Sequence, residues 1–146
     1  MLIYAAAHGR VLEAAMRTGE HRMERSSVAR SFARETNSVP QARHWATKVY
    51  ADAGVDEDLV ELCGLLVSEA VTNAVTHSAG TEFTVVVLPD LWIEVWDDSP
   101  VLPRRRVADL DSEGGRGLQL MEMCAPGYQV LETTDGKAVR FLPKGW

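Results

Sequence analysis

The longest regular pattern of apolar residues runs from about residue 57 to 77, where apolar positions recur at three- and four-residue spacing. Asp56 stands where a helix N-cap is expected, and Glu57 and Asp58 follow in the first turn, where carboxylates interact favourably with the helix dipole. One narrow side of this helix is clearly polar, and it is formed by Glu61, Ser68, Thr72 and Thr76. The pattern therefore predicts a helix that is buried over most of its circumference.

The flanking segments predict one earlier helix, one later helix and a set of short strands. The earlier helix is expected from Ser38, paired with Gln41 in a capping box and with Pro40 in the first turn, to about Ala53, with Gly54 at its C-terminal cap. Strands are expected at 29–36, 81–88, 91–97, 128–133 and 138–142, and the later helix at 117–124. This order predicts an α+β fold, a two-layer sandwich with helices packed on one face of a mixed, mostly antiparallel sheet.

The length of 146 residues fits one domain, and 46% hydrophobic and 25% charged residues are ordinary for a globular protein. We expect residues 28–146 to form this domain and residues 1–27 to be an N-terminal tail or extra helix. A short helix at 5–17 is weakened by Gly9. The change in composition near this boundary raises the hypothesis that translation starts at Met23.

Charge and cysteine content narrow the class of protein. Fifteen Lys and Arg against 21 Asp and Glu leave a net charge of −6, which disfavours non-specific binding to nucleic acid. No uninterrupted apolar run approaches the roughly 20 residues that span a bilayer, and the first residues lack the features of a signal peptide. Cys63 and Cys124 make neither a disulfide framework nor a metal site. The sequence predicts a cytoplasmic protein that binds neither nucleic acid nor membranes directly.

Three polar residues recur every four positions along the long helix, namely Glu69, Asn73 and His77. This spacing places them on one stripe, in line with leucines that point inward. A carboxylate there suits proton abstraction from an attacking hydroxyl or water, and an amide oxygen suits Mg²⁺. The alternative is a polar helix face whose groups are satisfied locally, with His77 near the C-terminus as a partner of the helix dipole.

Two further segments carry candidate chemistry. Asp97 ends a strand, where its carboxylate can accept a hydrogen bond from a ligand amine, although Asp and Ser before Pro also initiate turns. The glycine-rich segment 114–118 opens a helix, where backbone N–H groups and Arg116 suit a phosphate, although such a segment also suits a flexible hinge. The run 104–106 of three arginines is typical of a solvated surface, with contact to a phosphate or an acidic partner as the alternative.

In this order the motifs resemble those of a known family. LVSEAVTNAVTH at 66–77 is similar to the N box of the Bergerat-fold ATPases, which include gyrase, histidine kinases, MutL and heat-shock chaperones. The ending in His, together with DDSP at 97–100, GGRGL at 114–118 and GKAVRF at 136–141, resembles the anti-sigma-factor serine/threonine kinases. More narrowly, it resembles the small single-domain type abundant in actinobacteria, and the resemblance covers about residues 28–143.

The resemblance implies a Bergerat ATP-binding fold that takes ATP and Mg²⁺. By matching position, Glu69 is the general base, Asn73 the Mg²⁺ ligand and Asp97 the group that recognises the adenine amino group. The same matching assigns ATP contacts to His77 and to the lid residues Gly115, Arg116, Gly117 and Leu118. Family members bind a sigma factor or phosphorylate a Ser or Thr on an anti-anti-sigma antagonist, and many are homodimers.

Two departures from the family pattern bear on nucleotide affinity. Ser99 and Pro100 stand where the family has glycines after the aspartate, and Ala138 stands where Thr often follows Gly-Lys. Three functions follow from these residues: a kinase that also sequesters a partner, a nucleotide-binding anti-sigma-like module with little phosphotransfer, and a Mg²⁺-dependent hydrolase of another phosphorylated substrate.

Overall fold

The computed structural model describes residues 27–77, 80–97, 115–133 and 136–144. These residues form three helices and five strands in the order that the sequence predicts. Their bounds are β1 Val28–Ala33, α2 Ser38–Asp52, α3 Glu57–His77, β2 Glu82–Val87, β3 Ile93–Asp97, α5 Gly115–Cys124, β4 Gln129–Thr133 and β5 Gly136–Phe141.

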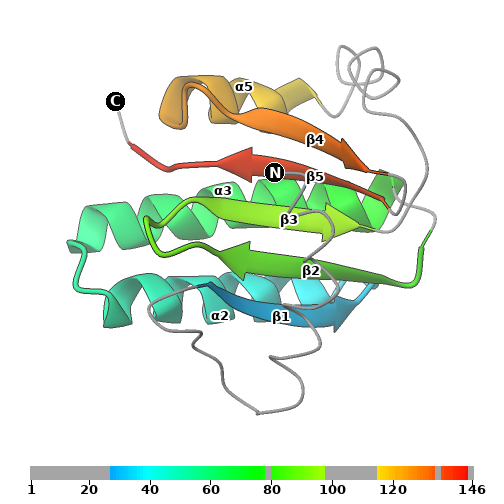
Figure 1. Cartoon of the computed structure of the whole chain (residues 1–146), viewed down its shortest axis with the longest axis horizontal. Helices are drawn as coiled ribbons and strands as arrows, with labels where there is room; N and C mark the ends of the chain where they lie inside the picture. The colour runs from blue at the N-terminus through cyan, green and yellow to red at the C-terminus, as the bar shows by residue number, and fades with distance from the viewer. Residues whose placement is uncertain (1–26, 78–79, 98–114, 134–135, 145–146) are drawn as a thin grey trace.

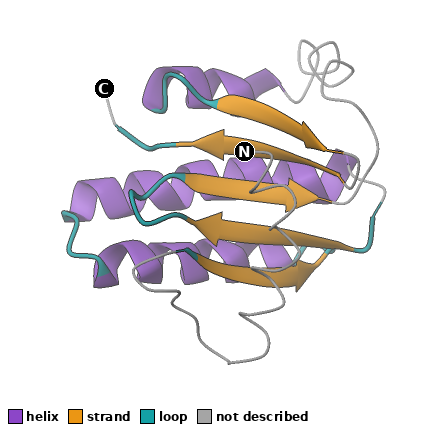
Figure 2. Ribbon diagram, viewed as in Figure 1, coloured by secondary structure: helices purple, strands orange, loops and turns teal. Residues whose placement is uncertain are grey.

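The five strands make one sheet in the order β1-β2-β3-β5-β4, and the helices lie on one face of it (Figures 1 and 2). Every neighbouring pair of these strands is antiparallel, so the parallel component of the expected mixed sheet does not occur among them. The core lies between the sheet and the helices. The predicted α+β two-layer sandwich is thus confirmed.

The ends of the first two helices test the sequence prediction directly. The capping box at the start of α2 is wrong: Ser38 is the buried first residue of the helix, its backbone N–H donates to Glu35 O at 2.9 Å, and Asn37 at the N-cap makes no side-chain cap. At the other end, Gly54 has φ +86° and donates to Ala51 O at 3.0 Å, which confirms its predicted role after the helix. The predicted N-cap of α3 is also confirmed, because Leu59 N–H donates to Asp56 Oδ1 at 2.9 Å.

Helix α3 is the central helix of the layer, between α2 and α5 (Figure 1). By length and composition alone it is long and apolar enough to cross a membrane. In the fold, however, its apolar residues pack against the sheet and the neighbouring helices, so its composition is that of a core helix. The buried residues are Leu62, Cys63, Gly64, Leu66, Val67, Ala70, Val71 and Ala74.

The contact between α2 and α3 is close at Gly64. A Cβ atom at this position would lie 3.0 Å from Thr47 Cγ2 and 3.4 Å from Arg43 Cγ. The absence of a side chain therefore sets how near the two helices approach. The same contact fixes which side of α3 faces away from α2.

The hairpin between β2 and β3 turns at Pro89 and Asp90, as the sequence predicts. Leu91 follows with φ +74°, a left-handed conformation that is costly for a residue with a Cβ. Its carbonyl accepts a hydrogen bond from the hydroxyl of Tyr50, a fully buried residue of α2. This bond ties the turn to the helix layer.

Candidate functional site

The polar stripe on α3 lies at the edge of the buried side of the helix. Glu69, Asn73 and His77 are all half-buried. With about 100° of rotation per residue, they fall within about 80° of one another. The predicted stripe is therefore present, with its groups at the boundary between core and surface.

The stripe is on the flank of α3 that faces away from α2. Arg43 of α2 donates from Nη1 to Ser68 Oγ at 3.0 Å, so Ser68 points toward α2. Glu69 is the next residue, and it points about 100° away from Ser68. The flank that carries Glu69, Asn73 and His77 thus faces the part of the helix layer where α5 lies (Figure 1).

Asp97 lies on the helix-facing side of the sheet, at the end of β3. Successive strand residues alternate between faces, and Ile93 and Val95, which share its face, belong to the core beneath the helices. Across the ladder Asp97 is in register with Lys137, which opens β5 on the same face. The carboxylate is therefore placed between the two layers and not on the outer surface of the sheet.

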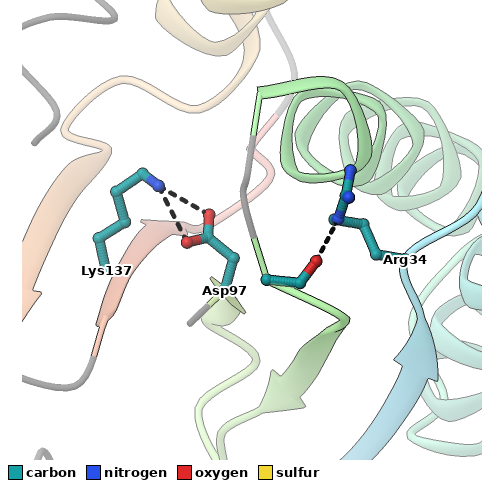
Figure 3. A network of polar contacts seen from close by, with 4 residues as sticks. Arg34, Asp97 and Lys137 are labelled. Carbon is teal, nitrogen blue, oxygen red and sulfur yellow. Dashed lines mark hydrogen bonds and ion pairs between the residues drawn. The ribbon is translucent and has the colours of Figure 1, made fainter. Parts of the chain in front are cut away.

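The carboxylate of Asp97 forms an ion pair with Lys137. Lys137 Nζ donates to Asp97 Oδ1 at 2.9 Å and to Oδ2 at 3.0 Å, and the side chains are 3% and 9% exposed respectively (Figure 3). A carboxylate oxygen can accept more than one hydrogen bond. The ammonium group thus holds the carboxylate in one orientation and offsets its charge within the low-dielectric layer.

The structure brings the predicted site elements to one end of the molecule. The C-terminal ends of α3 and β3 and the N-terminal end of α5 lie at the same end of the sandwich (Figure 1). Gly115, Arg116, Gly117 and Leu118 form the first turn of α5, two residues earlier than the predicted start of this helix. The side chains of residues 115–118 and the whole of residues 98–114 lie outside what the structure describes, so the predicted lid is not tested.

Arg34 fixes the chain just after α3. Its Nη1 donates to Val75 O at 2.9 Å, and its Nε donates to the carbonyl of Gly80 (Figure 3). Its backbone N–H also donates to Thr81 O at 2.9 Å. A cation at a helix C-terminus satisfies free carbonyls and interacts favourably with the dipole. Arg34 therefore holds the end of α3 that carries His77.

Sequence reasoning missed both Lys137 and Arg34 as residues of this region. A signal for Lys137 was present, because it is in step with Val139 and Phe141 on the side of β5 that faces the core. A charged residue at an inward position calls for a buried partner. Arg34 gave no such signal, because its partners are backbone carbonyls distant in sequence.

The residues on the stripe suit Mg²⁺ held jointly with a phosphate ligand. No group of three or more His, Cys, Asp or Glu side chains that could hold a metal occurs in the described ranges. Asn73 offers one amide oxygen, and Mg²⁺ ordinarily takes one or two protein oxygens and completes its shell with water and substrate phosphates. The donor set therefore fits a metal that arrives with a nucleotide and not a metal caged by the protein alone.

Comparison with known families agrees with this arrangement. The model of the histidine kinase-like ATPase domain matches residues 32–142, which is more than half of the chain, and the chain belongs to this family. No curated protein matches the sequence. The domain is thus an ATP-binding domain of the kinase and ATPase type, and the expected Bergerat-type superfamily is confirmed.

Proposed function

We propose that this protein is an ATP-dependent serine/threonine kinase of the anti-sigma-factor type. In this proposal it phosphorylates an anti-anti-sigma antagonist, sequesters a sigma factor, or does both, and it acts as a homodimer in the cytoplasm. The observation that carries the proposal is that Glu69 and Asn73 lie on the flank of α3 that faces away from α2, and that the C-terminal end of α3 lies at the same end of the molecule as the C-terminal end of β3, where Asp97 is the last residue (Figure 1). The motif resemblance supports the serine/threonine branch.

Asp97 provides adenine recognition. Its carboxylate accepts a hydrogen bond from the exocyclic amino group of adenine, while Lys137 keeps hold of the same carboxylate from β5. Guanine presents a carbonyl oxygen at the equivalent position, which a carboxylate repels. This chemistry predicts a preference for ATP over GTP.

Glu69 and Asn73 provide the chemistry at the terminal phosphate. Asn73 contributes an oxygen ligand to Mg²⁺, which when bound neutralises charge on the phosphates. Glu69, one helical turn earlier, accepts the proton of the attacking Ser or Thr hydroxyl. The hydroxyl oxygen forms a bond to the γ-phosphorus, the bond from that phosphorus to the β,γ-bridging oxygen breaks, and ADP leaves. His77, a turn beyond Asn73, and residues 115–118 of α5 contact the nucleotide.

Calorimetric titration of the full chain tests the binding step. Mg²⁺–ATP should bind, Mg²⁺–GTP should bind much more weakly, and Mg²⁺ alone should give little heat. Asp97→Asn should weaken ATP binding about 10- to 100-fold, because a hydrogen bond to a charged group is lost. Asp52→Asn, at an exposed carboxylate on α2, is the matched control and should bind like the parent. Equal ATP affinity in Asp97→Asn and the parent would remove Asp97 as the adenine-recognising residue.

Phosphorylation of candidate antagonist proteins tests the catalytic step. Glu69→Gln should lower the rate about 10²- to 10⁴-fold while ATP affinity changes little, because a general base acts in the transition state. Glu61→Gln, at an exposed position on the same helix, is the control and should retain the parent rate. Asn73→Ala should weaken Mg²⁺-dependent binding and phosphorylation together. A Glu69→Gln protein that phosphorylates as fast as the parent would leave the stripe as a polar lining only.

A binding module with little phosphotransfer is the second candidate. It is favoured by Ser99 and Pro100, which replace glycines that in the family follow the aspartate. The same titrations separate the two: a parent protein that binds ATP and its partners but phosphorylates none of them is a binding module.

A further inference from the structure

The ion pair at the end of β3 presents a hydrogen-bond donor as well as an acceptor. Lys137 Nζ lies 2.9 Å from Asp97 Oδ1 and 3.0 Å from Asp97 Oδ2 (Figure 3). An ammonium group carries three N–H donors, and the two bonds to the carboxylate engage two of them. An ionised carboxylate only accepts hydrogen bonds. The two side chains therefore place a donor and an acceptor side by side.

The backbone ladder between β3 and β5 fixes where these two groups stand. Asp97 is directly opposite Lys137 in this antiparallel pair, and Ile93 is opposite Phe141 at the other end of the same ladder. Because strand residues alternate between faces, all four side chains share the face on which Ile93 and Phe141 belong to the core. Side chains directly opposite each other on one face of an antiparallel pair are close neighbours. The donor and the acceptor are thus held toward the helix layer by regular strands.

Adenine carries the complementary pair of groups on its six-membered ring. Its exocyclic amino group donates hydrogen bonds, and the adjacent ring nitrogen N1 accepts them on the Watson–Crick edge. This edge is the one farthest from the ribose, whereas N7 belongs to the five-membered ring that carries the sugar. Asn73, the proposed Mg²⁺ ligand, is on α3 in the helix layer, and Asp97 is on the sheet. A nucleotide with its phosphates near Asn73 therefore directs its amino group and N1 toward the sheet.

We propose that Lys137 recognises the adenine base directly, donating from Nζ to N1 while Asp97 accepts from the amino group. This inference rests on the proposed function and deepens the nucleotide specificity of the same site. Guanine in the same orientation places its carbonyl oxygen against the carboxylate and its N1–H against the ammonium group. Acceptor then faces acceptor and donor faces donor, so both side chains contribute to the exclusion of GTP.

Nucleotides that lack one ring nitrogen test the contact without any change in the protein. In 1-deaza-ATP a C–H group replaces N1, in 7-deaza-ATP a C–H group replaces N7, and both keep the amino group. In calorimetric titration of the full chain with Mg²⁺ present, 1-deaza-ATP should bind about 10- to 100-fold more weakly than ATP, because a hydrogen bond to a charged group is lost. The affinity for 7-deaza-ATP should stay within about threefold of that for ATP. Equal affinities for ATP and 1-deaza-ATP, or a loss confined to 7-deaza-ATP, would overturn the proposal.

Variants of Lys137 show whether its ammonium group is the donor to N1. In Lys137→Met the ratio of the affinities for ATP and 1-deaza-ATP should fall to about 1, while Lys48→Met, at an exposed lysine on α2, should keep the parent ratio. Because Lys137→Met leaves a carboxylate without its cation, the ratio is also measured in Asp97→Asn and in the double variant. Asp97→Asn should keep the ratio and the double variant should lose it. A parent ratio in both variants that lack Lys137 would overturn the proposal, since another group would then donate to N1.

The titrations also separate a failure of this inference from a failure of the proposed function. A parent chain that does not bind Mg²⁺–ATP would overturn the proposed function and the role of Lys137 with it. A parent chain that binds ATP and 1-deaza-ATP equally well would leave the proposed function in place and would overturn the role of Lys137 alone.

Discussion

Lys137 and Asp97 place opposite charges between the sheet and the helices, where water has little access. A buried pair of this kind is stabilising only while both partners are present, because the desolvation of each charge is offset by the other. The geometry is favourable, since one ammonium group reaches both carboxylate oxygens at 2.9 and 3.0 Å. The site thus contains a charge that cannot be removed without leaving its partner unpaired.

Lys137→Met should destabilise the protein by about 3–5 kcal/mol, because the carboxylate of Asp97 is left buried without its cation. Adding Asp97→Asn to this variant should recover most of the loss, since the remaining charge is removed. Urea unfolding followed by circular dichroism measures both. Lys48→Met, which breaks the exposed pair with Asp52, is the control and should cost less than about 1 kcal/mol. A loss for Lys137→Met no larger than for Lys48→Met would contradict the account of the buried pair.

Among the elements, helices α2 and α3 pack closely against each other at Gly64. Two effects compete there when a side chain is added. Ala in place of Gly favours the helix by about 1 kcal/mol, but its Cβ would meet Thr47 Cγ2 at 3.0 Å. The neighbouring methyl group therefore decides the sign of the change.

Gly64→Val should destabilise the protein by about 1–3 kcal/mol, because the larger side chain forces the helices apart. In a background of Thr47→Ser, which removes the methyl group, Gly64→Ala should instead stabilise by about 1 kcal/mol relative to that background. The coupling between the two positions is measured by thermal or urea unfolding of four proteins, namely the parent, Thr47→Ser, Gly64→Ala and the double variant. Additive effects of Thr47→Ser and Gly64→Ala would show that the helices move apart freely.

The extent to which the sequence predicts the fold also differs among elements. The N-cap Asp56 and the end at Gly54 were predicted because caps depend on residues that are adjacent in sequence. The capping box at Ser38 was wrong because Ser38 is already inside the helix, where its side chain is buried. The site was predicted on α3 and β3 by motif, but Lys137 was missed because its role depends on register with β3.

At the scale of the whole molecule, buried ionisable groups lower the free energy of unfolding at alkaline pH. Burial raises the pKa of the Cys63 thiol from 9.0 to about 12. Burial also raises the pKa of Tyr50, with nearby Cys63 and Asp90 adding to the effect. Below the pKa values that Cys63 and Tyr50 have in the unfolded chain, both groups are protonated in the folded and the unfolded state, so they do not change the free energy of unfolding. Above them the unfolded chain releases protons that the folded protein retains.

Through Cys63 and Tyr50, the free energy of unfolding should therefore not change with pH below about pH 9 and should fall as the pH rises toward 12. Cys63 contributes up to about 1.4 kcal/mol for each pH unit in that window. Cys63→Ala should reduce this slope while lowering stability at pH 7.5, because a cavity forms. Urea unfolding at several values between pH 7.5 and 10.5 measures the slope. Cys63→Val, which fills more of the space, should share the reduced slope, and a parent-like slope in both variants would contradict the assignment.

Arg34 gives the sheet edge a mechanical connection to the helix that carries Glu69 and Asn73. β1 is the outermost strand on its side of the sheet, and Arg34 comes directly after it. The guanidinium group holds the carbonyls of Val75 and Gly80, so a displacement of β1 is transmitted to the last turn of α3. The polar stripe ends at His77 in that turn, so Arg34 joins the β1 edge to the end of α3 that carries part of the candidate site.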